Sequence, residues 1–386
     1  MKALIVEGAW NPRKNYPVSK EEQAKKRANV GSQVWQHTQF EVKDVPIPHL
    51  QDDEMLVRIK SCGICGSDTH LYETDKEGYI IFSGVTELPR IIGHEFSGIV
   101  EQTGKNVRHV REGDWVAAES IMWCGMCHAC RSGSPNQCKY IKLMGLSADG
   151  AFAEYIAINE RYCWKINDFQ EIYSEDEAFD VGALIEPVGC AYNGLFIVGG
   201  GFQPGATVVV YGAGPIGLGA IALAKIAGAS QIIAFDVIDE RAHIALEMGA
   251  DYAFNTNKMR DCLPGEKVMQ ITKGWGADIQ IEAAGAAPVT IPEMEKSMAI
   301  NGKIIYLGRA ATTTSMHLDN LVSGANKIVG ARGHSGYAIF PSIIKLIATG
   351  RLKLDKMITA RYPFARIMEA IKASSERTDG KILIHM

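Results

Sequence analysis

The sequence predicts an α/β protein with two domains, a β-rich first domain and a second domain built on a doubly wound, six-stranded parallel sheet. The chain has 386 residues, more than the usual ~100–200 of one domain. Residues 61–185 combine glycine, cysteine and short apolar runs, which indicates strands joined by long functional loops. From Ala206 onward, apolar runs alternate with helical segments, which is typical of a parallel sheet covered on both faces.

The second domain is predicted in most detail. Its expected strands are 207–211, 231–235, 252–254, 278–283, 303–307 and 327–331. Its expected helices are 216–227, 241–248, 266–273 and 291–299. Six parallel strands match the doubly wound fold that binds dinucleotides.

The expected domain limits are 1–187, 188–331 and 332–386, with the last segment returning to the first domain. That tail is predicted to hold helices at 340–349 and 364–374 and a strand at 382–385. Residues 1–6 are too short an apolar run for a signal peptide and are expected to form a first strand. No apolar stretch is expected to reach the ~20 residues of a membrane span. We therefore expect a cytoplasmic protein.

Charge argues against nucleic acid as a partner. The formal net charge is -4 and the sequence pI is about 6.2, whereas neutralising phosphates requires a basic face. The basic run Lys25-Lys26-Arg27 lies close to Glu21 and Glu22, so a solvated helix face explains it better.

A glycine motif follows the first strand of the second domain. Gly212-Ala213-Gly214-Pro215-Ile216-Gly217 is G-x-G-x-x-G between a predicted strand and a predicted helix. Gly212 permits a tight turn, Gly214 allows the backbone to approach a pyrophosphate, and Gly217 allows the helix to pack close to the strand. The helix N-terminus then presents free N–H groups to the phosphates.

The next strand ends at Asp236, nineteen residues after Gly217. A carboxylate there accepts hydrogen bonds from the ribose hydroxyls and repels a 2′-phosphate. Val237 adds no positive charge, so the sequence favours NAD over NADP. The alternative is a glycine-lined packing site without a ligand.

Four cysteines, Cys124, Cys127, Cys130 and Cys138, form C-x2-C-x2-C-x7-C. Four thiolates at this spacing can surround one tetrahedral zinc and leave no open position, so the metal would be structural. An iron–sulfur cluster and four unrelated thiols are the alternatives.

A second set of metal-ligand types is spread along the chain at Cys65, His94, Glu95 and Glu186. Cysteine, histidine and carboxylate are the ligands of a catalytic zinc with an exchangeable position. Such a metal polarises an alcohol or ketone oxygen. A hydroxyl such as Ser67 could accept the alcohol proton, and His70, which titrates near neutral pH, could pass it to solvent. His94 or Glu186 alone would more often be structural.

Taken together, these residues resemble the zinc-containing medium-chain alcohol/polyol dehydrogenases over almost the whole chain. The matching pieces are C-G-I-C-G-S-D-T-H, G-H-E, the four-cysteine lobe, Glu186-Pro187 and G-A-G-P-I-G. The resemblance implies a GroES-like catalytic domain split around an inserted Rossmann domain, with the active site in a cleft. It also implies an NAD-dependent enzyme that moves hydride between the coenzyme and a secondary alcohol or ketone.

The family pattern further implies a role for each site residue. Cys65, His94 and Glu95 would bind the catalytic zinc, and Glu186 would bind it directly or through its water. Ser67 and His70 would match the proton relay. The coenzyme contacts would include Ile216, Asp236, Arg241, Leu307 and Gly308. With the structural site, the chain would hold two zinc ions.

Some segments depart from the family pattern. Residues 11–37 and 72–89 are longer than usual, and G-H-S-G at 333–336 is unusual. His334 could contact substrate hydroxyls or serve a structural turn. Several short runs, among them E-S-I-M-W-C-G and E-P-V-G-C-A-Y-N, resemble bacterial dehydrogenases that act on cyclitols.

Other readings remain open at this point. Within the family the alternatives are sorbitol-, threonine- or amino-cyclitol-type dehydrogenases. A zinc-independent quinone or enoyl reductase would lack the catalytic zinc ligands, and a non-enzymatic zinc-ribbon binding protein would have no use for the glycine turn. A small polyol is the expected partner, without nucleic acid or membrane. Relatives suggest a homo-oligomer, either a dimer or a tetramer.

Overall fold

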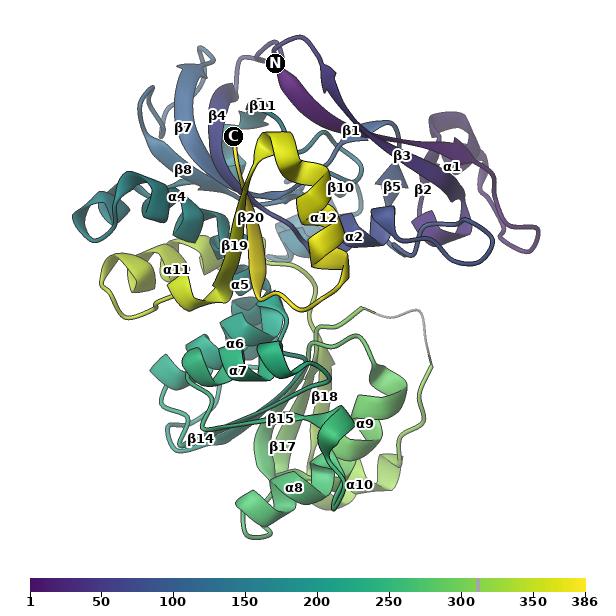
Figure 1. Cartoon of the computed structure of the whole chain (residues 1–386), viewed down its shortest axis with the longest axis vertical. Helices are drawn as coiled ribbons and strands as arrows, with labels where there is room; N and C mark the ends of the chain where they lie inside the picture. The colour runs from purple at the N-terminus through teal and green to yellow at the C-terminus, as the bar shows by residue number, and fades with distance from the viewer. Residues whose placement is uncertain (310–312) are drawn as a thin grey trace. The chain divides into compact units, whose positions relative to one another are not determined.

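The computed structural model describes residues 1–309 and 313–386, which divide into two compact units (Figure 1). Unit 1 comprises Met1–Glu186, Ala360–Arg377 and Ile382–Met386, and unit 2 comprises Pro187–Thr359 and Thr378–Lys381. The chain thus returns to the first unit at Ala360, later than the expected residue 332. Residues 332–359 stay with unit 2, where Ile339 packs against Gly189.

Unit 1 is built on antiparallel sheets. The largest has the order β12-β8-β7-β4-β20-β19, and β11 also pairs with β4. Its strands are β4 (Glu54–Gly63), β7 (Glu95–Thr103), β8 (Trp115–Ala118), β11 (Tyr155–Asn159), β12 (Cys163–Lys165), β19 (Ile358–Pro363) and β20 (Lys381–His385). The smaller sheets contain β1 (Lys2–Trp10), β2 (Arg27–Ala28), β3 (Trp35–Asp44), β5 (Thr86–Glu87), β6 (Arg90–Ile91), β9 (Ile121–Met122) and β10 (Lys142–Leu143).

Alternation of apolar residues explains why these strands form sheets. Met55, Val57 and Ile59 on β4 are buried in one core, together with Phe96 and Val100 from β7. The helices of this part of the chain are α1 (Lys20–Lys25), α2 (Gly66–Tyr72), α3 (His128–Arg131), α4 (Glu175–Ala183), α5 (Ile185–Tyr192) and α12 (Ile367–Ser375). The 3-10 turns are η1 (Gly31–Gln33), η2 (Pro135–Gln137), η3 (Glu160–Tyr162), η4 (Asn167–Glu171) and η8 (Phe364–Arg366).

Helix α4 lies in a region for which the sequence predicted only strands and loops, and α5 follows directly after that region. A capping box marks the start of α4, because Ser174 and Glu177 each bond the other's backbone N–H. That signal could have predicted the helix. The run Glu175–Val198 also corrects the expectation of short apolar stretches, since it is long and apolar enough to span a membrane. However, 72% of its most apolar 18-residue stretch is buried inside the protein, as in a core helix.

Unit 2 contains the predicted parallel sheet, with strand order β15-β14-β13-β16-β17-β18. Numbered from β13, this is 3-2-1-4-5-6, the doubly wound order. The strands are β13 (Thr207–Tyr211), β14 (Gln231–Asp236), β15 (Tyr252–Asn255), β16 (Ala277–Glu282), β17 (Met298–Tyr306) and β18 (Lys327–Gly330). The helices and turns are α6 (Pro215–Ile226), α7 (Asp239–Glu247), α8 (Pro264–Ile271), α9 (Ala287–Lys296), α10 (Leu318–Gly324), α11 (Ile339–Ala348), η5 (Asn193–Val198), η6 (Thr256–Lys258) and η7 (Asp355–Met357).

Both faces of this sheet are buried. Val209 and Tyr211 share a core with Val268 of α8 and Ile291 of α9, which lie side by side in Figure 1. Helix α6 packs on the opposite, Val210 face of β13. The predicted elements are all present. Several limits differ from the prediction by one to five residues. The clearest difference is at residues 298–299, which were expected in a helix but open β17, because Met298 pairs with Ala277 of β16.

A buried carboxylate ties α4 to the main sheet of unit 1. Asp180 is 1% exposed; its Oδ1 accepts hydrogen bonds from Ser61 Oγ (2.9 Å) and His385 Nε2 (2.7 Å), and its Oδ2 accepts one from Arg361 Nε (2.6 Å). Burial alone would raise the pKa of Asp180, but the bonds from His385, Arg361 and Ser61 outweigh it and lower that pKa.

We therefore expect Asp180→Ala to destabilise unit 1 by about 3–5 kcal/mol at pH 7, because buried donors lose their charged acceptor. Since the folded pKa is depressed, this contribution is complete above the unfolded pKa of about 4 and is lost as the pH falls through the folded pKa. Urea unfolding followed by tryptophan fluorescence measures it. Five of the six tryptophans belong to unit 1: Trp10, Trp35, Trp115, Trp123 and Trp164.

Asp176→Asn is the matched control, since Asp176 is an exposed residue in the first turn of the same helix. Its loss should stay below about 1 kcal/mol. Equal losses in the two variants would contradict the role given to the Asp180 network.

Candidate metal and coenzyme sites

The antiparallel pairing of β4 with β7 assembles the first candidate metal site. Gly63, the last residue of β4, is paired with Glu95, the first residue of β7. Because the end of one strand meets the start of the other, Cys65 just beyond β4 comes beside His94 just before β7. The ligand atoms of Cys65, His94 and Glu95 all lie within 4.8 Å of one another. His94 and Glu95 are buried, and Cys65 is half-buried.

The chemistry of this donor set suits zinc. Zinc–sulfur, zinc–nitrogen and zinc–oxygen distances of about 2.0–2.3 Å bring tetrahedral ligand atoms to within about 4 Å of one another. The three donors are already nearly that close. Burial opposes protonation of His94, but the charges of Asp68, Cys65 and Glu186 raise its pKa well above the ordinary value. These acidic groups gather negative charge around the imidazole, and such a site favours a divalent cation.

Asp68 lies beside His94 and was not predicted from the sequence as a site residue. It is fully buried; its Oδ2 accepts a hydrogen bond from the Cys65 N–H (2.9 Å), and its Oδ1 lies 3.7 Å from His94 Nδ1. A carboxylate on the far nitrogen of a metal-ligating histidine orients the ring and raises its basicity. The C-x-x-D spacing at the start of α2, which places Asp68 in a capping box with Cys65, could have indicated this.

Glu186 also lies near this group, outside the trio of closest donors. Its charge acts on His94, and its Oε1 accepts a hydrogen bond of 2.6 Å from Ser120 Oγ. Both side chains are buried. Ser120 follows β8, which is paired with the start of β7, and Glu186 lies in the first turn of α5. The hydrogen bond from Ser120 thus fixes one carboxylate oxygen of Glu186 near His94.

The two relay candidates lie on α2, directly after Cys65. Ser67 Oγ is 3.4 Å from His94 Nε2, so its hydroxyl lies beside the donor set. His70 is three residues further along and so faces the same side of the helix. Its carbonyl accepts hydrogen bonds from the Ile81 and Phe82 N–H groups (3.0 and 3.1 Å).

The segments that depart from the family pattern, 11–37 and 72–89, pair with each other. Strand β2 pairs with β5, the Gly31 N–H donates to the Gly84 carbonyl, and Arg13 bonds Asp75 and Glu77. Since residues 81–82 bond the His70 carbonyl, this paired region borders the relay helix.

The second candidate metal site is the four-cysteine lobe. All four sulfurs lie within 4.8 Å of one another, and Cys127 Sγ is 3.5 Å from Cys130 Sγ and 3.8 Å from Cys138 Sγ. A tetrahedral zinc with Zn–S distances of about 2.3 Å requires sulfur atoms about 3.8 Å apart. Backbone N–H groups also point at the sulfurs and lower the thiol pKa of Cys127 and of Cys124.

The glycine turn occupies the carboxyl edge of the parallel sheet in unit 2. Gly212 has a φ of +93°, and a Cβ there would lie 2.6 Å from the Ala284 nitrogen. A Cβ on Gly217 would lie 1.9 Å from the Gly212 carbonyl oxygen. A Cβ on Gly214 would meet only Arg241 Nη1, at 3.6 Å, so the backbone there is open to a phosphate. Ile216 lies half-buried in the first turn of α6.

Asp236 ends β14 and touches the glycine turn. Its carboxylate accepts hydrogen bonds from the N–H groups of Ala213 (2.7 Å), Val237 (2.7 Å) and Ile238 (3.0 Å). It therefore fixes the turn as well as offering lone pairs to a ribose. Arg241 is held from behind, because its Nε donates to the Asp379 carbonyl at 2.9 Å.

Leu307 and Gly308 follow β17 at the same edge. Their N–H groups both donate to the Glu282 carbonyl (2.9 and 2.8 Å) at the end of β16. The buried Glu282 side chain in turn accepts hydrogen bonds from Gly285 and Ala286. The structure therefore gathers the predicted coenzyme residues of unit 2 along one sheet edge, where open α/β sheets bind ligands.

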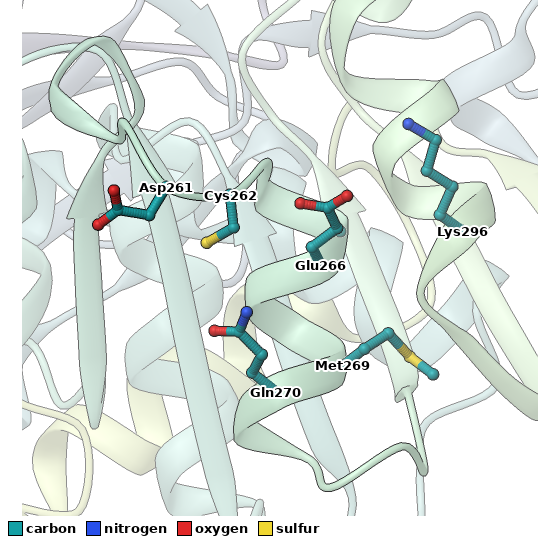
Figure 2. Close-up of a pocket in the computed structure, with 7 residues that line it drawn as sticks. Asp261, Cys262, Glu266, Met269, Gln270 and Lys296 are labelled. Atoms are coloured by element: carbon teal, nitrogen blue, oxygen red, sulfur yellow. The ribbon is translucent and has the colours of Figure 1, made fainter.

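His334 is fully buried, and its side chain packs against Gly189 and the Phe340 ring. This packing favours the structural reading of His334. A pocket of about 330 Å³ at α8 lies apart from every predicted site residue, and Figure 2 shows side chains that line it. Its lining side chains include Asp261, Cys262, Glu266, Met269, Gln270 and Lys296.

The chain combines two features: unit 2 is doubly wound and carries a glycine turn, and unit 1 is β-rich and carries a Cys/His/Glu donor set. Together they define a metal-dependent, dinucleotide-linked oxidoreductase. Comparison with known proteins agrees. Residues 51–168 match the alcohol dehydrogenase GroES-like domain, and residues 215–349 match the zinc-binding dehydrogenase domain. The chain belongs to the zinc-dependent medium-chain alcohol/polyol dehydrogenase family, and it is an oxidoreductase. The alternative of a non-enzymatic zinc-ribbon protein is therefore wrong.

Three relatives illustrate the similarity. Scyllo-inosose 3-dehydrogenase of Thermotoga maritima is 36% identical over 96% of both chains. L-threonine 3-dehydrogenase of Bacillus licheniformis is 32% identical over 88% of this chain and 93% of its own. A solved Thermotoga maritima structure, described as an alcohol dehydrogenase, has a TM-score of 0.94 at 34% identity and covers all of both chains.

The two donor sets predict about two zinc ions per chain. Cys65→Ser and Cys127→Ser should each reduce the content to about one, because each removes a ligand from a different site. Only Cys127→Ser should also lower the thermal stability markedly, since a structural zinc contributes folding energy. Metal analysis of gel-filtered protein and thermal melts measure both effects. Zinc content unchanged by Cys65→Ser would refute the first site.

Proposed function

We propose that this protein is an NAD-dependent dehydrogenase of a cyclitol or related polyol, acting on a secondary alcohol or its ketone. The observation that carries the proposal is the convergence of Cys65, His94 and Glu95 at one sheet edge, beside the hydroxyl of Ser67. The likeness to scyllo-inosose 3-dehydrogenase, at 36% identity over 96% of the chain, favours a ring polyol of inositol breakdown as substrate.

The donor set supports a catalytic zinc on Cys65, His94 and Glu95, with Glu186 as a further ligand or as the holder of a water. When bound there, zinc would polarise the substrate oxygen. Asp68 orients the His94 ring from behind, and Ser120 fixes one oxygen of Glu186. The four-cysteine lobe would hold a second, structural zinc.

The chain's own residues handle the proton. Ser67 Oγ can take the proton of the substrate hydroxyl and pass it on, and His70 can deliver it to solvent. NAD would lie on the glycine turn, with its ribose hydroxyls on Asp236 and its nicotinamide at Leu307 and Gly308. When bound, NAD would accept the hydride, so unit 1 would supply the proton path and unit 2 would hold the coenzyme.

A homo-oligomer in the cytoplasm completes the proposal. Apolar side chains are exposed at one edge of the parallel sheet, on β17, α10 and β18: Ile300 (78% exposed), Leu318 (70%), Val322 (80%) and Ile328 (43%). Strand β18 is an edge strand, and exposed apolar edges commonly mark association surfaces. This supports pairing with a second copy. The net charge of -4 speaks against nucleic acid as a partner.

A substrate panel tests the function directly. Inososes, inositols, sugar alcohols, diols and L-threonine are assayed with NAD and with NADP at 340 nm. We expect the highest kcat/KM with a cyclitol and NAD, and loss of turnover after chelation. L-threonine as the best substrate would favour the second candidate, a threonine dehydrogenase, which the 32% identical relatives suggest.

Cys65→Ser distinguishes the proposed metal site from the proposed NAD site. Turnover should fall by at least about 1,000-fold, because electrostatic stabilisation of the reacting oxygen is lost. NAD binding, measured by calorimetry, should stay within about threefold of the parent because Cys65 belongs to unit 1 and the glycine turn to unit 2. Full turnover by metal-depleted Cys65→Ser protein would show that the assigned site is wrong.

Asp236→Ser should change the coenzyme preference. A charge-assisted hydrogen bond contributes about 1.5–3 kcal/mol, so the NAD/NADP ratio of kcat/KM should fall by about 10–100-fold. Because Asp236 also bonds three backbone N–H groups, Asp236→Asn serves as the control that keeps its size and some of its acceptors. An unchanged ratio in the serine variant contradicts the ribose assignment.

A further inference from the structure

A charged pair lies beside the relay histidine. Arg377 comes two residues after α12, which packs against α2, the helix that carries His70. Arg377 Nη2 lies 3.5 Å from His70 Nε2 and donates a hydrogen bond of 2.9 Å to Glu73 Oε2. Glu73 is the residue at which α2 ends, and all three residues belong to unit 1. A cation, a carboxylate and the imidazole thus form one small cluster.

The chain geometry places Arg377 there. Its backbone adopts a left-handed φ of +61°, and its N–H donates to the Ser374 carbonyl at 3.1 Å, which closes the end of α12. A non-glycine residue in this conformation costs free energy, so the surrounding contacts hold it in place. The ion pair with Glu73 is one such contact.

Uncharged groups bond the backbone of His70 and Leu71. The N–H groups of Ile81 and Phe82 bond its backbone carbonyl, and Thr38 Oγ1 of β3 bonds the Leu71 carbonyl at 2.8 Å. Burial lowers the pKa of His70, the charge of Arg377 lowers it further, and the charge of Glu73 opposes them. Arg377 and Glu73 are therefore the charged side chains that act on this ring.

We propose that Arg377 is a positioning residue for His70: its guanidinium holds the imidazole as a neutral acceptor and makes any proton taken up there leave quickly to water, while Glu73 keeps the guanidinium in place. This inference rests on the relay role proposed above. A guanidinium has only donors, so it can approach Nε2 favourably only when that nitrogen carries no proton. A protonated ring would set two cations 3.5 Å apart.

The consequence is a relay that works below the usual pH range of histidine. His70 gains a proton from the substrate path and gives the same proton to water, and no electrons move in the cluster. A ring that stays neutral in mildly acidic solution can accept the next proton, so turnover in the oxidative direction persists there.

The ring can be followed without turnover. Protein labelled with 13C at histidine Cε1 is titrated by NMR in its zinc-loaded form, and His70→Asn assigns the His70 signal among the ten histidines. We expect R377Q to raise the His70 midpoint, and R377K, which keeps the charge, to leave it near that of the parent. R366Q is the matched control, because Arg366 pairs with Glu369 beside the same helix. An unmoved midpoint in R377Q overturns the inference.

The pH profile of polyol oxidation is the second readout. We expect kcat/KM of R377Q at pH 6 to fall by about three- to tenfold and to meet the parent value above about pH 8, where the ring is neutral in both. A loss that is equal at every pH would indicate a purely structural role and would overturn the inference. A midpoint that moves while the profile stays unchanged supports the action of Arg377 on the ring and overturns the relay role of His70, so the two failures are distinguishable. Thermal melts check that each variant folds.

Discussion

The pairing of β4 with β7 is the constraint on which the chemistry of unit 1 depends. It places Gly63 opposite Glu95, and this single register brings a thiolate from one loop against an imidazole and a carboxylate from another. The neighbouring groups follow from the same edge: β8 supplies Ser120, and α2 supplies Asp68 and the relay residues. A slip of one residue would move every side chain of β7 to the opposite face and disperse the donors.

In unit 2, buried carboxylates hold the loops at the carboxyl edge of the parallel sheet. The Asp236 carboxylate binds the backbone of the glycine turn and of its own strand end, so the same group would shape the proposed phosphate cradle and offer oxygens to a ribose. At the end of β16, the Glu282 carboxylate binds the backbone of Gly285 and Ala286. The coenzyme edge is therefore preorganised by buried acids, whose hydrogen bonds offset the cost of burying them.

Much of this arrangement could be predicted from local sequence. Strand β13 has the predicted limits, and the glycine motif lies where a tight turn and a close helix require it, because both signals lie within a few consecutive residues. The zinc donors were recognisable by residue type and by family resemblance. Ser120, which bonds Glu186, and Arg377, which lies beside His70, were not predicted, because strand register and helix packing determine these contacts over long sequence distances. Asp68 was also missed, although its bond to the Cys65 N–H spans only three residues. Helix α4 was missed although its capping box is local, since the glycine- and cysteine-rich surroundings suggested strands.

The position of β20 has a consequence for how the chain is made. This last strand, Lys381–His385, lies between β4 and β19 in the main sheet of unit 1. During synthesis on the ribosome, the unit that begins first can therefore be completed only when residues 381–385 emerge. Residues 187–359 of unit 2 leave the exit tunnel earlier as one uninterrupted stretch. Most of unit 2 is thus available for folding before unit 1 is complete, and Cys65 stays beside an incomplete sheet until β20 emerges.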